Sequence, residues 1–186
     1  ARWTPARNRE RPRAPEQRLV VLSEAACTFA HITRGRHGLT QSEMRTLDVP
    51  RRVEIALWLD HVPAHEPIGV CFSGGIDSGS VFLTTYHVMK SRGMALGRLK
   101  AFVLDLDRGD APDLQQSRAF LDSVELGLFL EAVQADPATI DVQETIGIIE
   151  DYQSLDVQSA SMTIALLRGI RQQYPEWRYL LDGDGG

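Results

Sequence analysis

The chain has 186 residues, of which 43% are hydrophobic and 24% are charged, and its net charge at pH 7 is −5. These values predict one globular domain with a sizeable core, and they argue against general nucleic-acid binding. No apolar run approaches the roughly 20 residues of a membrane-spanning helix, so we expect neither a membrane nor a nucleic acid as a partner.

Residues 1–18 differ in composition from the rest of the chain. They contain three Pro and six Arg but almost no aliphatic residue, so they have little to bury. We interpret them as a basic tail or linker without fixed structure, with a nucleic-acid-binding arm as the less favoured alternative. Residues 19–186 are expected to form the folded domain.

Two segments precede the first strong pattern. Leu19–Leu22 is a candidate strand, whereas residues 23–40 have no clear periodicity. His31 and His37 lack the clustered partners that a metal site requires, so we do not predict a metal site there.

A helix is predicted over Arg51–Val62, with Pro50 just before its start. Its apolar residues Val53, Leu57 and Val62 fall on or near one face, which we expect to be buried.

The two cysteines, Cys27 and Cys71, form no CxxC pair, which argues against a zinc cluster or a redox site. Cys71 lies in an apolar run and is interpreted as a small core residue. A reducing, cytoplasmic setting is therefore expected.

The strongest local pattern begins at Ile68–Phe72, an apolar run that predicts a short buried strand. The string Ser73-Gly74-Gly75-Ile76-Asp77-Ser78 follows it and leads into a segment with helical spacing. A tight loop between a strand and a helix presents free backbone N–H groups and the positive end of the helix dipole, which suits phosphate. The spacing of the helical segment comes from Val81, Thr85, Val88 and Met89.

Each residue type in this loop fits a phosphate site. Gly74 and Gly75 have no side chain to block a ligand, and Ser73 and Ser78 add hydroxyl donors. A carboxylate beside phosphate is repulsive unless a cation lies between them, so Asp77 indicates Mg²⁺. The alternative is an ordinary strand-to-helix turn in which Asp77 or Ser78 caps the helix.

Strands and helices alternate through the rest of the chain, which predicts an α/β fold with a doubly wound, mostly parallel sheet and helices on both faces. Ligands bind such sheets at the carboxyl ends of the strands, so the loops that follow three of the strands are expected to meet in one crevice. The predicted strands are Ile68–Phe72, Leu99–Leu106, Leu128–Val133 and Tyr179–Leu181. The predicted helices begin at Pro112 and at Asp136-Pro137, the latter running towards Asp151, and a further one covers Ser159–Gln173.

The string from Ser73 to Ser78 resembles the PP-loop of the N-type ATP pyrophosphatases. Its flanks are similar to the asparagine synthase family, which includes β-lactam synthetase-like relatives. The resemblance implies a Rossmann-like PP-loop fold that binds ATP and Mg²⁺. It also implies that Ser73, Gly74, Gly75 and Ser78 hold the pyrophosphate and that Asp77 binds Mg²⁺.

A second strand end, Phe102-Val103-Leu104-Asp105, is similar to the family segment whose apolar residue holds adenine through backbone contacts. Leu104 matches that apolar residue, whereas Asp105 stands where the family has Gly. Leu104 and Cys71 are therefore expected to border the nucleotide.

The last strand end, residues 180–186, resembles the family's Leu-Ser-Gly-Glu-Gly segment. Asp182 falls on the Ser and Gly183 on the Gly, so both are expected to bind the nucleotide. Asp184 falls on the Glu that acts in acid/base chemistry at the forming amide, which makes Asp184 the catalytic candidate.

The resemblance implies an ATP-dependent amide-forming ligase. A substrate carboxylate is adenylated with release of pyrophosphate, and an amine or ammonia then displaces AMP. The alternatives are another PP-loop enzyme, either NAD synthetase-like or tRNA-modifying, or a nucleotide-binding module without turnover.

The expected partners are a small-molecule carboxylate and an amine or ammonia donor, together with a second copy of the chain or a separate glutaminase. Family members continue past the position of Gly186 into a region with a catalytic Lys. We therefore expect the domain to be incomplete at its C-terminal end, and these residues alone to bind nucleotide without completing amide synthesis.

Overall fold

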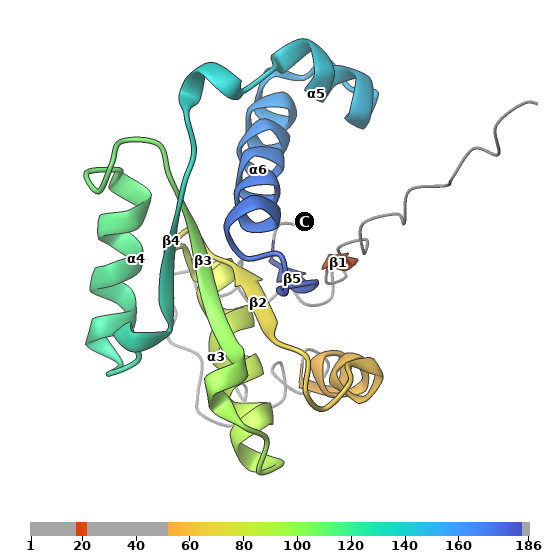
Figure 1. The fold of residues 1–186 in the computed structure, drawn as a ribbon, viewed down its shortest axis with the longest axis vertical. Coiled ribbons are helices and arrows are strands. Elements are labelled where there is room, and N and C mark those ends of the chain that lie inside the picture. Colours follow the sequence, from red (N-terminus) through yellow and green to blue (C-terminus); the bar gives the residue numbers. More distant parts are fainter. Residues whose placement is uncertain (1–17, 22–51, 184–186) are drawn as a thin grey trace, which may run out of the picture.

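The computed structural model describes residues 18–21 and 52–183 (Figure 1). Five strands form one sheet in the order β1-β5-β2-β3-β4, and every neighbouring pair is parallel. The predicted α/β class with a parallel sheet is thereby confirmed. The strands are β1 (Arg18–Val21), β2 (Ile68–Cys71), β3 (Leu99–Asp105), β4 (Leu130–Gln134) and β5 (Tyr179–Asp182).

Four labelled helices connect these strands, and a further helix over residues 52–61 precedes β2. Among the described helices, none combines the length and the apolar character needed to cross a membrane. The α-helices are α3 (Ile76–Ser91), α4 (Pro112–Ser123), α5 (Val142–Ile149) and α6 (Ser154–Gln173), and short 3-10 helices cover Leu96–Arg98, Gly127–Phe129 and Pro137–Thr139.

The direction of the chain across the sheet reverses at β2. After β2 the chain adds β3 and then β4 on one side, and it returns through α5 and α6 to place β5 on the other side of β2. Because parallel crossovers are right-handed, this reversal puts α6 on the face opposite α3 and α4 (Figure 1). A crevice opens at such a reversal, at the carboxyl ends of the central strands.

Two apolar cores cover the two faces of the sheet. On one face Phe82 of α3 and Leu59 of the helix over residues 52–61 pack against β2, and both side chains are at most 2% exposed. On the other face Leu166 and Ile170 of α6 pack against Phe102 of β3. Burying large apolar side chains on both sides of the strands is the main stabilising contribution of such a fold.

The buried face of the helix over residues 52–61 differs from the prediction. Val53 is 49% exposed and Leu57 is 57% exposed, whereas Ile55 and Leu59 are buried together with Val62. The apolar residues of this helix occupy more than one face, so their spacing alone did not identify the face that packs on the sheet.

Several predicted boundaries shift in the structure. The third strand was expected at Leu128–Val133, but Gly127–Phe129 forms a 3-10 turn and β4 begins at Leu130. The last helix begins at Ser154, five residues before the predicted start. Residues 1–17 of the predicted tail, Cys27, His31 and His37 lie outside the described residues, and Arg18 already belongs to β1.

Helix α5 also starts later than predicted, because Asp136 and Asp141 both act as caps. The Asp136 side chain accepts a hydrogen bond from Ala138 N and starts only a 3-10 turn. The Asp141 carboxylate accepts hydrogen bonds from Gln143 N and Glu144 N, so the α-helix begins at Val142. Side-chain oxygens of this kind satisfy the free N–H groups of a first helical turn.

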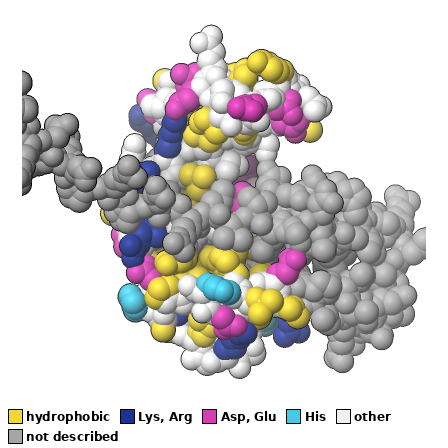
Figure 2. All heavy atoms as spheres, turned by 90° about the vertical axis from the view of Figure 1, so that its right-hand side faces the viewer, with side chains coloured by type: hydrophobic (Ala, Val, Ile, Leu, Met, Phe, Trp, Pro, Cys, Tyr) yellow, Lys and Arg dark blue, Asp and Glu magenta, His cyan; other side chains and the backbone are white. Residues whose placement is uncertain are grey.

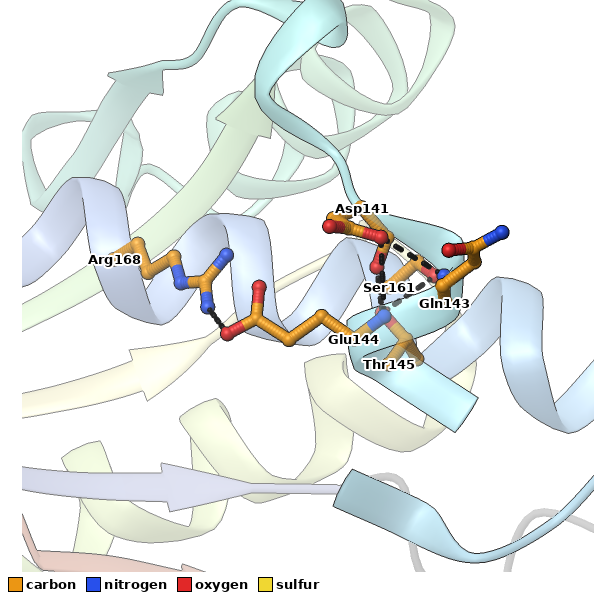
Figure 3. A network of polar contacts seen from close by, with 6 residues as sticks. All are labelled: Asp141, Gln143, Glu144, Thr145, Ser161 and Arg168. Atoms are coloured by element: carbon orange, nitrogen blue, oxygen red, sulfur yellow. Dashed lines mark hydrogen bonds and ion pairs between the residues drawn. The ribbon is translucent and has the colours of Figure 1, made fainter. Parts of the chain in front are cut away.

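Helix α5 is attached to α6 by polar contacts (Figure 3). Arg168 of α6 donates to the Glu144 carboxylate at 2.6 Å, and the buried Ser161 hydroxyl donates to Thr145 Oγ1 at 3.1 Å. Exposed hydrophobic and acidic side chains gather at the same end of the molecule (Figure 2). The exposed hydrophobic residues of α5, of the turn that follows it and of the first turn of α6 are Val142, Ile148, Tyr152 and Leu155.

Candidate functional site

A cavity of about 600 Å³ lies at the carboxyl ends of β2, β3 and β5. Its walls come from these strand ends, from the loop between β2 and α3, from the first turn of α4 and from one face of α6. This is the crevice that a reversal of strand order creates. Eight of the predicted site residues line it: Cys71, Ser73, Gly75, Asp77, Ser78, Leu104, Asp182 and Gly183.

The loop between β2 and α3 is held by two serines. The Ser78 hydroxyl accepts a hydrogen bond from Ser73 N at 3.2 Å and lies 3.2 Å from the Ser73 hydroxyl. No side chain caps the N-terminus of α3, whose N-cap residue is Gly75. The first N–H groups of a helix have no partner within the helix, so this uncapped turn at the cavity can donate to an anion.

The two glycines of the loop have different roles. Gly74 has φ +73°, and a Cβ at this position would lie 2.7 Å from Ser117 N of α4. Gly74 is therefore required by the backbone path and by packing, and it does not line the cavity. Gly75 has φ −74° and ψ 168°, which any residue can adopt, and its Cβ would meet only Ser73 Oγ at 3.4 Å. The fold therefore tolerates a side chain at Gly75. What the lack of a side chain provides at this position is free space in the cavity.

Four carboxylates line the cavity, and no Lys, Arg or His is among its described lining residues. Among residues 18–21 and 52–183, no group of three or more His, Cys, Asp or Glu side chains is arranged to hold a metal ion. Hard carboxylate oxygens nevertheless suit Mg²⁺, which commonly takes one or two of them and completes its shell with phosphate and water. The donor set therefore fits that cation. The four carboxylates are Asp77, Asp107, Asp113 and Asp182.

The end of β3 divides its residues between cavity and core. Leu104 lines the cavity, whereas Asp105 is completely buried and does not. The Asp105 carboxylate accepts hydrogen bonds from Asp107 N at 3.1 Å and from the Gln134 side chain of β4. Asp105, which stands where the family has Gly, therefore stabilises the loop after β3 and does not take up space in the cavity.

The end of β5 approaches the start of α3 closely. A Cβ on Gly183 would lie 3.2 Å from Ser78 N, so a side chain here would require the neighbouring backbone to move by a few tenths of an ångström. Asp182 and Cys71 both line the cavity. Burial raises the pKa of the Cys71 thiol well above its ordinary value, and the charge of Asp182 raises that pKa further. Cys71 is therefore a protonated wall residue, and thiolate chemistry is not expected from it. Asp184, the catalytic candidate, lies outside the described residues.

Sequence reasoning missed the contribution of α6 to the cavity. Gln158, Ser159, Met162, Thr163 and Leu166 of α6 line it, at the three- and four-residue spacing of one helix face. This spacing was visible in the sequence. The sequence did not show that this face lines the cavity, because the face is directed toward the loop only by the path of α6 across the sheet to β5.

Comparison with known proteins identifies the family of this chain. The family model described as asparagine synthase matches residues 59–186, which is more than half of the chain. Among curated proteins, no match was found. The NH3-dependent NAD synthetase from Campylobacter jejuni subsp. jejuni NCTC 11168, solved in complex with the nitrate ion, is a structural neighbour with a TM-score of 0.45 and 13% identity. The alignment covers 74% of this chain and 54% of that chain, so the present chain spans about half of its length. By the extent of the family match, the chain belongs to the asparagine synthase family, a PP-loop family that uses ATP.

Proposed function

We propose that the cavity binds Mg²⁺-ATP and that the domain acts as an ATP-dependent ligase, forming an amide from a small-molecule carboxylate and an amine or ammonia. In this proposal Ser73, Gly74, Gly75 and Ser78 form the loop that holds the pyrophosphate portion. Asp77 binds Mg²⁺, and Asp182 and Gly183 complete the phosphate side of the cavity.

One observation carries the proposal: an uncapped helix N-terminus opens into the cavity beside a glycine that has room in front of it. Three features occur together there: backbone N–H donors, the positive end of the α3 dipole and free space. Together they favour a bound phosphate group.

The other walls of the cavity support a nucleotide over a simple anion. Leu104 and Leu106 of the β3 end, together with Met162 and Leu166 of α6, give the cavity an apolar wall. Nucleotide sites typically combine an apolar surface for the base with a few polar groups for the phosphates. We assign Leu104 to the adenine side and Cys71 to the floor between the two regions.

The four carboxylates make the lining of the cavity negative, so a phosphate group needs a cation to enter it. Mg²⁺ held by Asp77 would supply positive charge beside the phosphate oxygens. The protein residues position the two reactants and shield them from water, which is the main contribution a protein makes to phosphoryl chemistry.

The proposed reaction has two balanced steps. A carboxylate oxygen attacks the α-phosphorus of ATP while the bond to the β-phosphate oxygen breaks, and pyrophosphate leaves with its electron pair. The amine nitrogen then attacks the acyl carbon, AMP leaves, and the amine loses one proton to a base. Asp184 is the predicted base.

The proposal is tested first by binding and then by turnover. In isothermal titration calorimetry we expect ATP to bind in the presence of Mg²⁺, and the Gly75→Val variant not to bind it. With carboxylates labelled with ¹⁸O, we expect one label to pass from the carboxylate to AMP. Formation of ADP and phosphate in place of AMP and pyrophosphate would contradict the proposed reaction class.

A second candidate function is a nucleotide-binding module without turnover. It is favoured by the absence of Lys and Arg among the described residues that line the cavity, because charge on the departing pyrophosphate is commonly stabilised by a basic group. Binding of Mg²⁺-ATP without AMP formation for any carboxylate and amine tested would support it.

A further inference from the structure

The loop between β2 and α3 rests on the backbone of α4. A Cβ on Gly74 would lie 2.7 Å from Ser117 N and 2.9 Å from the carbonyl carbon of Gln116. The Gln116 side chain runs alongside, and its amide Nε2 donates a hydrogen bond to the Gly74 carbonyl at 2.9 Å. Gln116 itself does not line the cavity, so its contact with the site is made through the loop.

The acceptor of this hydrogen bond is the carbonyl of the Gly74–Gly75 peptide. The described peptide bonds include no cis bond, so the carbonyl of Gly74 and the N–H of Gly75 point in opposite directions. Because Gln116 holds the carbonyl toward α4, the N–H of Gly75 points away from α4, and Gly75 is the residue that lines the cavity.

A peptide between two glycines has little intrinsic preference for one orientation. Neither residue has a Cβ to oppose rotation, so the peptide can turn over with only small changes elsewhere in the chain. After such a flip a carbonyl oxygen would take the place of the N–H. An oxygen in that position repels phosphate, whereas an N–H binds it.

We propose that Gln116 is a positioning residue that holds the Gly74–Gly75 peptide in its phosphate-binding orientation. This inference rests on the proposed function, because it assumes that the loop binds the pyrophosphate portion of ATP. It assigns the role to a residue of α4 that lies outside the loop and that no motif in the sequence marks.

The matched variants are Gln116→Met and Gln115→Met. Methionine has nearly the length of glutamine but cannot donate a hydrogen bond. Gln115 is the neighbouring exposed residue, and its amide donates to the Asp110 carbonyl at 3.3 Å, away from the loop. The probes are inorganic pyrophosphate with Mg²⁺, and adenosine.

For Gln116→Met we expect pyrophosphate binding to weaken about 10- to 100-fold, the range for loss of a charge-assisted hydrogen bond. Adenosine binding is expected to stay unchanged, and Gln115→Met is expected to bind both probes like the wild type. In a crystal structure of Gln116→Met, the Gly74–Gly75 peptide is expected to be flipped or to occupy two orientations.

Two results would overturn the inference alone: unchanged pyrophosphate binding with one unflipped peptide, or equal weakening for pyrophosphate and adenosine, which indicates a general loss of the cavity. Failure of the wild-type protein to bind pyrophosphate would overturn the proposed function, and the inference with it. The wild-type titration therefore separates the two failures.

Discussion

At the residue scale, the two glycines of the loop can be separated by experiment. Gly75→Val is expected to leave folding stability nearly unchanged, because φ −74° suits valine and the nearest atom, Ser73 Oγ, lies at 3.4 Å from the new Cβ. The same variant is expected to lose the rise in melting temperature that Mg²⁺-ATP gives the wild type, because its side chain fills the space in front of the loop. Differential scanning fluorimetry with and without ligand measures both effects.

Gly74→Ala is the matched control, and in contrast to Gly75→Val it is expected to lower the folding stability. Its backbone angle of +73° and the 2.7 Å approach to Ser117 N should destabilise the folded state by about 2 kcal/mol or more. Full stabilisation of Gly75→Val by Mg²⁺-ATP would show that the phosphate site lies elsewhere.

A second residue-scale prediction concerns Asp77, which is exposed in the first turn of α3. Asp77→Asn keeps the shape of the side chain but removes its charge. Mg²⁺-dependent ATP binding should therefore weaken, whereas binding of ATP in EDTA should stay the same or improve, since a repulsive carboxylate has gone. Calorimetric titrations under both conditions give the comparison. An equal loss with and without Mg²⁺ would favour a role for Asp77 in the helix start alone.

The success of the sequence at this scale was uneven for physical reasons. The residues of the loop are adjacent in the chain, so their types and order were enough to predict a tight loop between a strand and a helix, which the structure has. The buried carboxylate of Asp105 was harder to interpret, because its partner Gln134 belongs to another strand. Gln116 carried no local signal, since its role depends on where α4 passes under Gly74.

At the element scale, the start of α5 gives a testable prediction. Asp141→Ala removes the acceptor for two backbone N–H groups and should cost about 1 kcal/mol of unfolding free energy. Asp136→Ala, which removes one acceptor from a 3-10 turn, should cost less. Urea denaturation of both variants measures the difference. A larger cost for Asp136→Ala would show that the 3-10 turn, and not α5, is the structure that this connection depends on.

The same connection shows why boundaries were less predictable than the elements themselves. The apolar strands were recognised because a continuous run such as Ile68–Phe72 can hardly be placed outside a core. Leu128 and Phe129 also form such a run, but Leu128 is 74% exposed, and the run begins with a 3-10 turn. Short turns of this kind depend on the register of the neighbouring strand, which the local sequence does not encode.

At the scale of the whole molecule, the cavity is assembled from segments that are distant in the sequence. The loop after β2, the ends of β3 and β5, the first turn of α4 and one face of α6 meet only at the reversal of strand order. The parallel sheet, and the edge at which the cavity lies, could be predicted from alternating strands and helices. The face of α6 that closes the cavity could not, because its place depends on the direction of the last crossover.

This assembly predicts how a bound nucleotide should alter hydrogen exchange across the molecule. Mg²⁺-ATP at 100 times its dissociation constant stabilises the native state by about 2.7 kcal/mol, so amides that exchange only by global unfolding should slow about 100-fold. Amides of β2 and β5 belong to this class, since the side chains of these strands lie in the two cores.

A ligand that also contacts α6 should slow local exchange at Gln158 and Ser159, which line the cavity. Helix α5 does not line that cavity, so its amides serve as the internal control. Protection of the loop without protection of the first turns of α6 would show that the cavity does not act as one binding site, and that the α6 wall belongs to a different ligand.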